Sequence, residues 1–285
     1  MSENLEKISN VAYIPQGHEL DIAFVCYNLK FPLMLRGPTG TGKTTLVSYL
    51  AQALKKPLIT ESCNEDTLAA DLIGRNLPHG WVDGSATKSL RFKDGSIYYL
   101  DELGEARADA IVVVHSLTDD RRYLEVRAHN EVLYSPEQWM LIASYNPLYQ
   151  LQSKIKPSTA QRFVTVDIPF PRQELENKIV KGFLENYKDI LEKEFVWKKY
   201  QRKDNVSVER LVKLAADYRK IAQGSDSFGL REGPGTRLVA RTAKLIQHGL
   251  PELLAIEVGM INPLTYEPDI KDAMIDVAKK LFRED

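Results

Sequence analysis

The 285-residue sequence has few cysteines, no long apolar run and no excess of charge of either sign. Its two cysteines, Cys26 and Cys63, argue against a disulfide framework and against a metal site built on CxxC spacing. No apolar stretch approaches the roughly 18 residues that indicate a membrane-spanning helix. The 38 basic and 39 acidic residues argue against bulk nucleic-acid binding, which usually needs a basic surface.

The rest of the composition is that of a folded protein. The chain is 44% hydrophobic and 27% charged, and it is long enough for one large domain or two smaller ones with cores of their own. Its first nine residues are polar and resemble neither a secretory signal nor a basic transit peptide. We therefore expect a soluble, cytoplasmic protein with reduced cysteines and no membrane span.

Residues 37–44 read GPTGTGKT, a complete GxxxxGKT phosphate-binding loop. The apolar run Pro32–Leu35 before it predicts a buried strand, and apolar residues at helical spacing from Leu46 to Leu54 predict a helix after it. A strand, this loop and a helix N-terminus together indicate a nucleoside triphosphate site. The predicted ATP-binding residues are Gly37, Pro38, Thr39, Gly40, Thr41, Gly42, Lys43, Thr44 and Thr45.

The residue types of this loop suit phosphate chemistry. Glycines let backbone N–H groups turn toward phosphate oxygens, and the helix N-terminus adds partial positive charge. The Lys43 ammonium is expected to reach the β and γ phosphates, and the Thr44 hydroxyl is expected to bind Mg²⁺.

Four more strand-like runs alternate with helical patterns up to residue 170. They are Pro57–Thr60, Ser96–Leu100, Trp139–Ala143 and Arg162–Val166. With the strand before the loop, they predict an α/β fold with a five-stranded parallel sheet and helices on both faces. After Pro171 only helical periodicity remains, so we expect a nucleotide-binding domain over residues 1–171 and a smaller helical domain over residues 172–285.

The apolar run Ile97–Leu100 ends in two acids, Asp101 and Glu102. Consecutive strand residues point to opposite faces, so the two carboxylates can take different roles. We expect Asp101 to help hold Mg²⁺ and Glu102 to polarise the attacking water. A solvated strand end is the alternative interpretation.

Three more polar residues are candidate catalytic groups. Asn146 follows the strand-like run 139–143 and is expected between the loop and the acid pair, although Asn before Pro is also a common turn. Arg162 starts the last strand, where it either caps a helix or pairs with an acid locally, or projects into a neighbouring subunit's nucleotide. Arg237 opens a helix after Gly235 and Thr236, a poor place for a cation unless it meets a phosphate or Glu232.

Two stretches contain more residues than the connections between the predicted strands require. Residues 64–95 are longer than a simple crossover helix, and residues 121–126 and 131–134 alternate like a hairpin. We interpret them as contact loops for a protein, with extra structural loops as the alternative. The candidate contact residues are Leu72, Ile73, Trp81, Tyr123 and Leu124. The basic run 198–203 is interpreted as a solvated face.

Taken in order, these motifs resemble AAA+ ATPases of the MoxR group, and more closely the CbbQ/NirQ/NorQ family. The motifs that carry the resemblance are residues 34–44, 70–75, 99–102, 117–122, 144–147, 156–163 and 232–238. One departure is Gly235-Thr236, where the family commonly has Ser-Thr. The last 35 residues carry no recognised motif.

The resemblance implies a ring-forming ATPase, usually a hexamer, that uses ATP and Mg²⁺, with Arg162 acting in trans and Arg237 as a second sensor. It also implies a partner with a von Willebrand A domain. In one branch a CbbO-like partner and the ATPase reactivate inhibited Rubisco by releasing tight-binding sugar phosphates, which is the function we expect here. NorQ- and NirQ-type maturation of nitric oxide reductase is the alternative within the family. A nucleic-acid motor and a nucleotide switch without turnover are the alternatives outside it.

Overall fold

The computed structural model describes residues 11–147, 155–185, 206–223, 230, 232–247, 249–265 and 267–282. The chain divides into two compact units. The first contains the residues up to 168 apart from 38–41, and the second contains residues 38–41 together with those from 169 onward. The sequence placed this boundary after Pro171.

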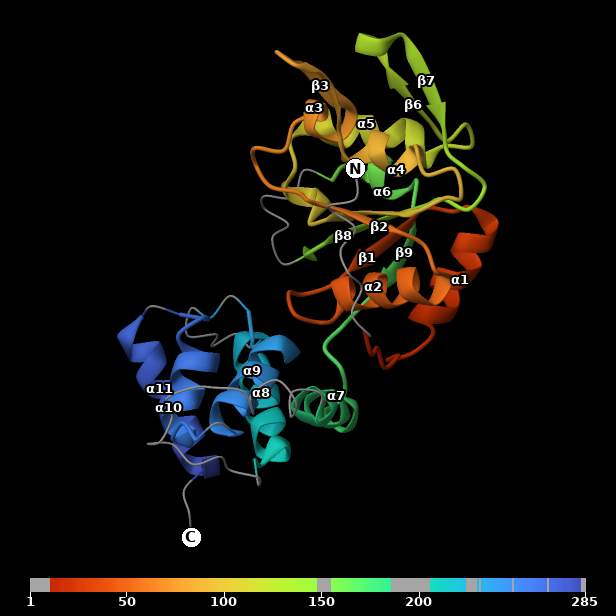
Figure 1. The fold of residues 1–285 in the computed structure, drawn as a ribbon. Coiled ribbons are helices and arrows are strands. Elements are labelled where there is room, and N and C mark those ends of the chain that lie inside the picture. The colour runs from red at the N-terminus through yellow and green to blue at the C-terminus, as the bar shows by residue number, and fades with distance from the viewer. Residues whose placement is uncertain are drawn as a thin grey trace. The chain divides into compact units, whose positions relative to one another are not determined.

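The first unit is built on a parallel five-stranded sheet (Figure 1). Its spatial order is β2-β5-β8-β1-β9, so the strand before the phosphate-binding loop lies between β8 and β9. The strands are β1 (Leu33–Arg36), β2 (Leu58–Ser62), β5 (Ile97–Asp101), β8 (Met140–Tyr145) and β9 (Val164–Asp167). The predicted α/β fold with five parallel strands is confirmed.

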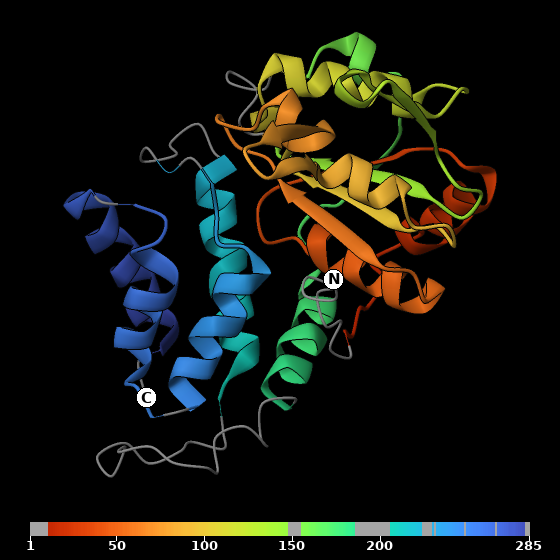
Figure 2. The ribbon, with the colours of Figure 1, turned by 45° about the horizontal axis from the view of Figure 1, so that its top comes forward.

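Both faces of this sheet are covered by helices, as Figure 2 shows from a second side. Side chains alternate between the faces along each strand. In β5, Ile97 and Tyr99 pack on the side of α1 (Glu19–Leu29) and α2 (Lys43–Leu54), whereas Tyr98 and Leu100 pack on the opposite side. Burial on both faces explains why the central strands read as continuous apolar runs.

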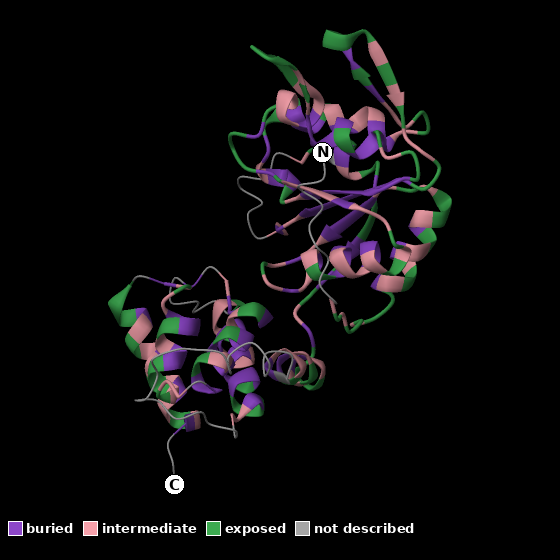
Figure 3. Cartoon of the chain, in the orientation of Figure 1, coloured by how far each residue is buried: buried purple, intermediate pink, exposed green. Residues whose placement is uncertain are grey.

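The opposite side is covered by three further helices. They are α3 (Ala69–Ile73), α4 (Ser85–Leu90) and α5 (Ala108–Thr118). Short 3₁₀ turns occupy Leu103–Glu105 and Arg127–His129, and the four-residue helix α6 (Pro157–Ala160) precedes β9. Figure 3 shows that the buried residues are concentrated in the sheet and the inner sides of these helices.

Two antiparallel hairpins extend from the first unit. The insert hairpin joins β3 (Gly74–Leu77) to β4 (Gly80–Asp83), and the second hairpin joins β6 (Tyr123–Val126) to β7 (Glu131–Tyr134). The second confirms the alternation seen in the sequence. Arg91 bonds to Asp83 of one hairpin at 2.7 Å and to Glu131 of the other at 2.8 Å, so the two lie side by side (Figure 1).

Two of the five expected contact residues, Leu72 and Leu124, are buried, so the prediction is wrong for them. Leu72 and Leu124 are 1% and 2% exposed, because both pack into the core beneath the hairpins. In the second hairpin, cross-strand pairs share a face, which places Leu124 with Leu133 on the inner side. The outer side instead carries Val132 and Tyr134, which are 47% and 70% exposed.

The second unit is helical, and no strand occurs among its described residues. Its helices are α7 (Gln173–Glu185), α8 (Val208–Gln223), α9 (Thr236–Gln247), α10 (Glu252–Ile256) and α11 (Pro268–Phe282), with a π-helical turn at Glu257–Ile261. Its core collects apolar faces from all five helices. The helical periodicity of the sequence that begins at Leu175 continues through Tyr187 and Leu191, but these two residues and the basic run 198–203 lie outside the described residues.

Neither cysteine forms a disulfide, and both are buried. Burial raises the pKa of the Cys63 thiol to about 12, which suits a packing residue rather than a reactive one. None of the helices in the described part of the chain is long and apolar enough to cross a membrane.

A buried ion pair ties three segments of the second unit together. Arg219 of α8 donates from both terminal nitrogens to Glu176 of α7, at 2.8 and 2.7 Å, and its Nε donates to the Pro234 carbonyl at 2.8 Å. The guanidinium also lies over the Phe170 ring at 4.3 Å. Pro234 belongs to the turn that leads into α9, so this pair fixes the start of that helix.

Replacing Arg219 by alanine is expected to destabilise the second unit by about 3–5 kcal/mol, because the Glu176 carboxylate would remain buried without its partner. Thermal or urea unfolding measures this. The double replacement Glu176→Gln with Arg219→Met removes both charges and is expected to recover part of the loss. A single variant as stable as the parent protein would contradict the assignment.

Candidate functional site

The phosphate-binding loop begins where β1 ends. The Gly37 N–H donates to the Tyr145 carbonyl of β8 at 3.2 Å, and a side-chain Cβ on Gly37 would lie 2.1 Å from the Ile168 carbonyl oxygen. Gly40 and Gly42 have φ angles of 80° and 98°, in the left-handed region that glycine adopts without strain. The loop therefore requires glycine at these three positions.

The loop leads directly into α2. Lys43 is its first residue, 9% exposed, and the Lys43 Nζ donates to the Gly37 carbonyl at 2.7 Å across the loop. Thr41 is buried and donates to the Pro38 carbonyl at 3.0 Å, whereas Thr39 and Thr45 are exposed. The lysine is thus held inside the curve of the loop at a helix N-terminus, where partial positive charge favours an anion.

Asp101 ends β5 beside the start of α2. The Thr44 hydroxyl donates to Asp101 Oδ2 at 3.2 Å. Two adjacent ligands of an octahedral Mg²⁺ ion, each about 2.0–2.1 Å from the metal, lie about 3 Å apart. The two oxygen atoms therefore fit adjacent positions of a magnesium shell, and both are hard oxygen ligands of the type that this ion prefers.

The other carboxylate oxygen of Asp101 accepts two short hydrogen bonds. The Tyr99 hydroxyl and the Ser144 hydroxyl each donate to Asp101 Oδ1 at 2.6 Å. Sequence reasoning did not select either residue. The signal was available, because Tyr99 lies two positions before Asp101 and strand residues two apart share a face.

Glu102 does not continue the strand, contrary to the sequence-based expectation. Its φ and ψ angles are 58° and 43°, in the left-handed region, and its side chain is exposed. Strand pairing ends at Asp101, where the backbone turns into the Leu103–Glu105 turn. The left-handed backbone therefore sets the direction of the Glu102 carboxylate. This conformation costs roughly 1–2 kcal/mol of conformational free energy for a residue other than glycine.

Asn146 lies directly after β8 and is 7% exposed. Since β8 lies between β5 and β1, its carboxyl end places Asn146 between Asp101 and the start of the loop. The structure thus gathers Lys43, Thr44, Asp101 and Asn146 at one edge of the sheet. Glu102 comes directly after Asp101 at the same edge.

Arg162 lies at the opposite edge of the sheet, where the amino ends of the parallel strands meet. It belongs to the turn before β9 rather than to the predicted strand, and it is exposed, because pairing starts only at Val164 opposite Leu33. Arg162 precedes Val164, which pairs with Leu33, and at about 3.3 Å per residue Leu33 lies roughly 13 Å along the strand direction before Gly37. That separation exceeds the length of an arginine side chain, so Arg162 cannot reach its own loop.

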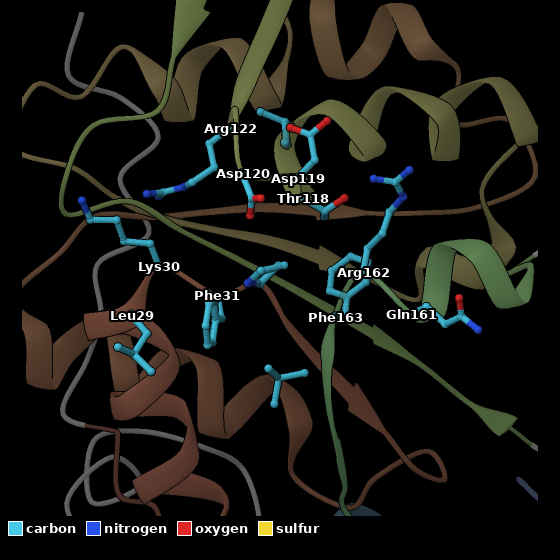
Figure 4. A pocket seen from close by; sticks show the side chains of 13 residues that line it. Leu29, Lys30, Phe31, Thr118, Asp119, Asp120, Arg122, Gln161, Arg162 and Phe163 are labelled. Atoms are coloured by element: carbon cyan, nitrogen blue, oxygen red, sulfur yellow. The ribbon is translucent and has the colours of Figure 1, made fainter.

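Arg162 is one of the residues that line a pocket of about 430 Å³ at this second edge (Figure 4). Its lining includes Lys30, Asp119, Asp120 and Arg122. The Arg122 guanidinium is engaged inside the protein, since it donates to the Trp139 carbonyl at 2.7 Å. Arg162 forms no ion pair with another described residue. Within that part of the chain, the alternative that Arg162 pairs with a local acid is therefore not supported.

Arg237 lies in the first turn of α9 in the second unit, and its side chain is exposed. A threonine just before a helix is a common cap, but Thr236 is the first helical residue of α9. Its buried hydroxyl has no hydrogen-bond partner in the structure. The Gly235 carbonyl instead accepts from the N–H groups of Leu238 and Val239, at 2.9 and 3.3 Å, so Gly235 occupies the cap position.

The fold and the loop define a P-loop ATPase of the AAA+ class. Residues 32–163 match the model of an AAA domain of the dynein-related subfamily. A putative ATPase from Cytophaga hutchinsonii aligns over 97% of this chain and 92% of its own, with a TM-score of 0.51 at 15% identity. NtrX from Brucella abortus aligns over 95% of this chain and 61% of its own, with a TM-score of 0.60 at 13% identity. These likenesses concern the fold alone.

The chain belongs to the CbbQ/NirQ/NorQ family. Residues 192–281 match the C-terminal model of that family. The chain is 40% identical to protein NorQ of Paracoccus denitrificans over 95% of this chain and 93% of that one. It is 38% identical to protein CbbQ of Hydrogenophilus thermoluteolus over 95% of this chain and 94% of that one. The resemblance inferred from the sequence motifs is thus confirmed.

Proposed function

We propose that this chain is the ATP-hydrolysing subunit of a ring that remodels a client protein. One observation carries the proposal. The residues to which we assign phosphate binding, metal binding and water activation lie at one edge of the sheet, while the exposed Arg162 lies at the other. An ATPase site divided in this way needs a second copy of the chain to complete it.

In the proposed mechanism Lys43 binds the phosphates, and Thr44 and Asp101 supply two oxygen ligands to Mg²⁺. When bound, the metal ion neutralises phosphate charge and orients the transferred group. Glu102 accepts a proton from the attacking water, which its exposed position at the site edge allows. The Asn146 amide N–H donates a hydrogen bond to a γ-phosphoryl oxygen, or its amide oxygen accepts one from the attacking water.

Two arginines complete the proposed site. Arg162 of one copy stabilises negative charge on the phosphoryl group held by the next copy, because a guanidinium matches phosphate geometry. Repetition of this head-to-tail contact closes a ring, for which we propose six subunits. Arg237 acts as the second sensor, contributed by α9 of the second unit.

The client is the finer part of the proposal. We propose that, with a von Willebrand A domain partner of the CbbO type, the ring reactivates Rubisco by releasing inhibitory sugar phosphates. Nitric oxide reductase maturation, as in NorQ- or NirQ-type systems, is the second candidate, supported by the 40% identity to NorQ beside 38% to CbbQ. The proposed location is the cytoplasm.

The test is a coupled carboxylation assay on cognate Rubisco inhibited by a sugar bisphosphate, with the ring, its partner and ATP. A nitric oxide reductase maturation assay is run beside it. Restored carboxylation that depends on ATP hydrolysis supports the first client. Activity only in the second assay moves the protein to the other client, and ATPase stimulation by DNA or RNA would contradict both.

The outer face of the hairpins is the proposed client contact. Replacing Tyr134, 70% exposed, by alanine is expected to reduce client reactivation at least several-fold and to leave basal ATPase within about twofold. The reason is that tyrosine is enriched among the few residues that carry most of the binding energy of an interface, while this strand lies away from the loop. Val25→Ala, 54% exposed on α1, is the control. Equal loss of both activities in Tyr134→Ala would contradict a client role.

A further inference from the structure

Two hydroxyl groups, both fully buried, converge on the Asp101 carboxylate. Tyr99 of β5 and Ser144 of β8 are each 0% exposed, and their hydroxyls lie 3.0 Å apart. Each donates to Asp101 Oδ1 at 2.6 Å. Asp101 Oδ2 is thereby left toward the Thr44 hydroxyl, 3.2 Å away.

The sheet itself produces this convergence. Tyr99 and Asp101 are two apart in β5, and Ser144 continues the β8 face that carries Ile142, the residue paired with Tyr99. All of these side chains point to the side of α2, which carries Thr44. Strand alternation and parallel register therefore bring the two donors to the carboxylate on the same side as the phosphate-binding helix.

Ser144 has a second contact that Tyr99 lacks. Its oxygen accepts a hydrogen bond from the Glu102 N–H at 3.1 Å. Glu102 is the residue in left-handed conformation, and a backbone hydrogen bond at that position holds the turn that directs its carboxylate. One hydroxyl thus links the orientation of Asp101 to the backbone of Glu102.

We propose that Tyr99 and Ser144 are positioning residues for ATP hydrolysis, with separable roles. Tyr99 fixes the rotation of the Asp101 carboxylate so that Oδ2 faces the metal position. Ser144 does the same and also holds the Glu102 peptide in its left-handed conformation. The inference rests on the proposed function, because it assigns these residues to the site where Mg²⁺ and ATP are proposed to bind.

The two roles predict different defects. Removing one donor from a metal-binding carboxylate typically weakens metal affinity 10- to 100-fold. Tyr99→Phe is therefore expected to raise the Mg²⁺ concentration for half-maximal nucleotide binding about tenfold, with turnover at saturating Mg²⁺ within about threefold of the parent protein. Ser144→Ala is expected to show the same shift and, in addition, a turnover at saturating Mg²⁺ lowered at least tenfold.

The experiment titrates Mg²⁺ into protein with a fluorescent, slowly hydrolysed ATP analogue and follows anisotropy. ATP turnover is measured separately at saturating Mg²⁺. Tyr98→Phe and Ser96→Ala are the matched controls, since each removes a fully buried hydroxyl from the same stretch of chain without touching Asp101. Ser144→Thr keeps the hydroxyl and is expected to recover most of both properties. Thermal unfolding confirms that all variants are folded.

Failure of the positioning roles and failure of the proposed ATPase function give different results. A Mg²⁺ midpoint in Tyr99→Phe equal to that in Tyr98→Phe would overturn the role of Tyr99. Turnover in Ser144→Ala equal to that in Tyr99→Phe would overturn the separate role of Ser144. A parent protein that neither binds the analogue with Mg²⁺ nor hydrolyses ATP would instead refute the proposed function itself.

Discussion

Replacing Glu102 by glutamine is expected to lower ATP turnover by roughly 10²- to 10⁴-fold while nucleotide binding stays intact. The amide cannot accept the proton of the attacking water, but it has nearly the same shape, and the phosphate-binding loop is unchanged. Lys43→Ala is expected to abolish nucleotide binding itself, because the loop loses the cation held by the Gly37 carbonyl. Steady-state ATPase rates and fluorescent nucleotide titrations distinguish the two defects.

Glu105→Gln is the matched control for the glutamine variant. It makes the same change to a neighbouring carboxylate in the turn that follows Glu102. We expect its turnover within about threefold of the parent protein. Unchanged hydrolysis in Glu102→Gln, or an equal loss in both variants, would remove Glu102 from its assigned role.

The second large effect is expected at Arg162. Arg162→Ala should lose on the order of 10³-fold in turnover and should still bind nucleotide, by analogy with arginine fingers. The structure gives the reason for expecting action on another subunit, since Val164 pairs with the start of β1 while the loop follows its end. Specific activity of the parent protein should therefore rise with protein concentration as rings form.

Arg127→Ala serves as a control, because it removes another exposed arginine, at the tip of the second hairpin. Its basal turnover is expected to stay within about threefold of the parent. A protein that is monomeric in sedimentation experiments and fully active would contradict the role given to Arg162.

Much of the fold was predictable because the sheet leaves a direct trace in the sequence. Central strands buried on both faces appear as apolar runs, and a glycine-rich loop between a strand and a helix has few structural interpretations. The second hairpin was predictable from alternation for the same reason. These features depend on residues adjacent in sequence, so local patterns suffice.

The errors arose where the outcome depends on contacts between distant segments. Leu72 and Leu124 are apolar residues next to exposed hairpins, and only packing shows that they are buried. The turn at Glu102 is stabilised by Ser144, 42 positions away in the sequence. Arg162 lies in a turn because pairing with β1 begins two residues later. None of these contacts is encoded in a local periodicity.

The central claim is that ATP is hydrolysed at sites that two copies of this chain complete together. The most direct test mixes Lys43→Ala protein with Arg162→Ala protein and measures ATP turnover against the mixing ratio. In mixed rings the Arg162→Ala subunit binds ATP and the Lys43→Ala subunit supplies the arginine, so turnover should rise well above that of either variant alone and peak at intermediate ratios. Turnover that remains the simple average of the two inactive proteins, under conditions where mixed rings form, would contradict the claim.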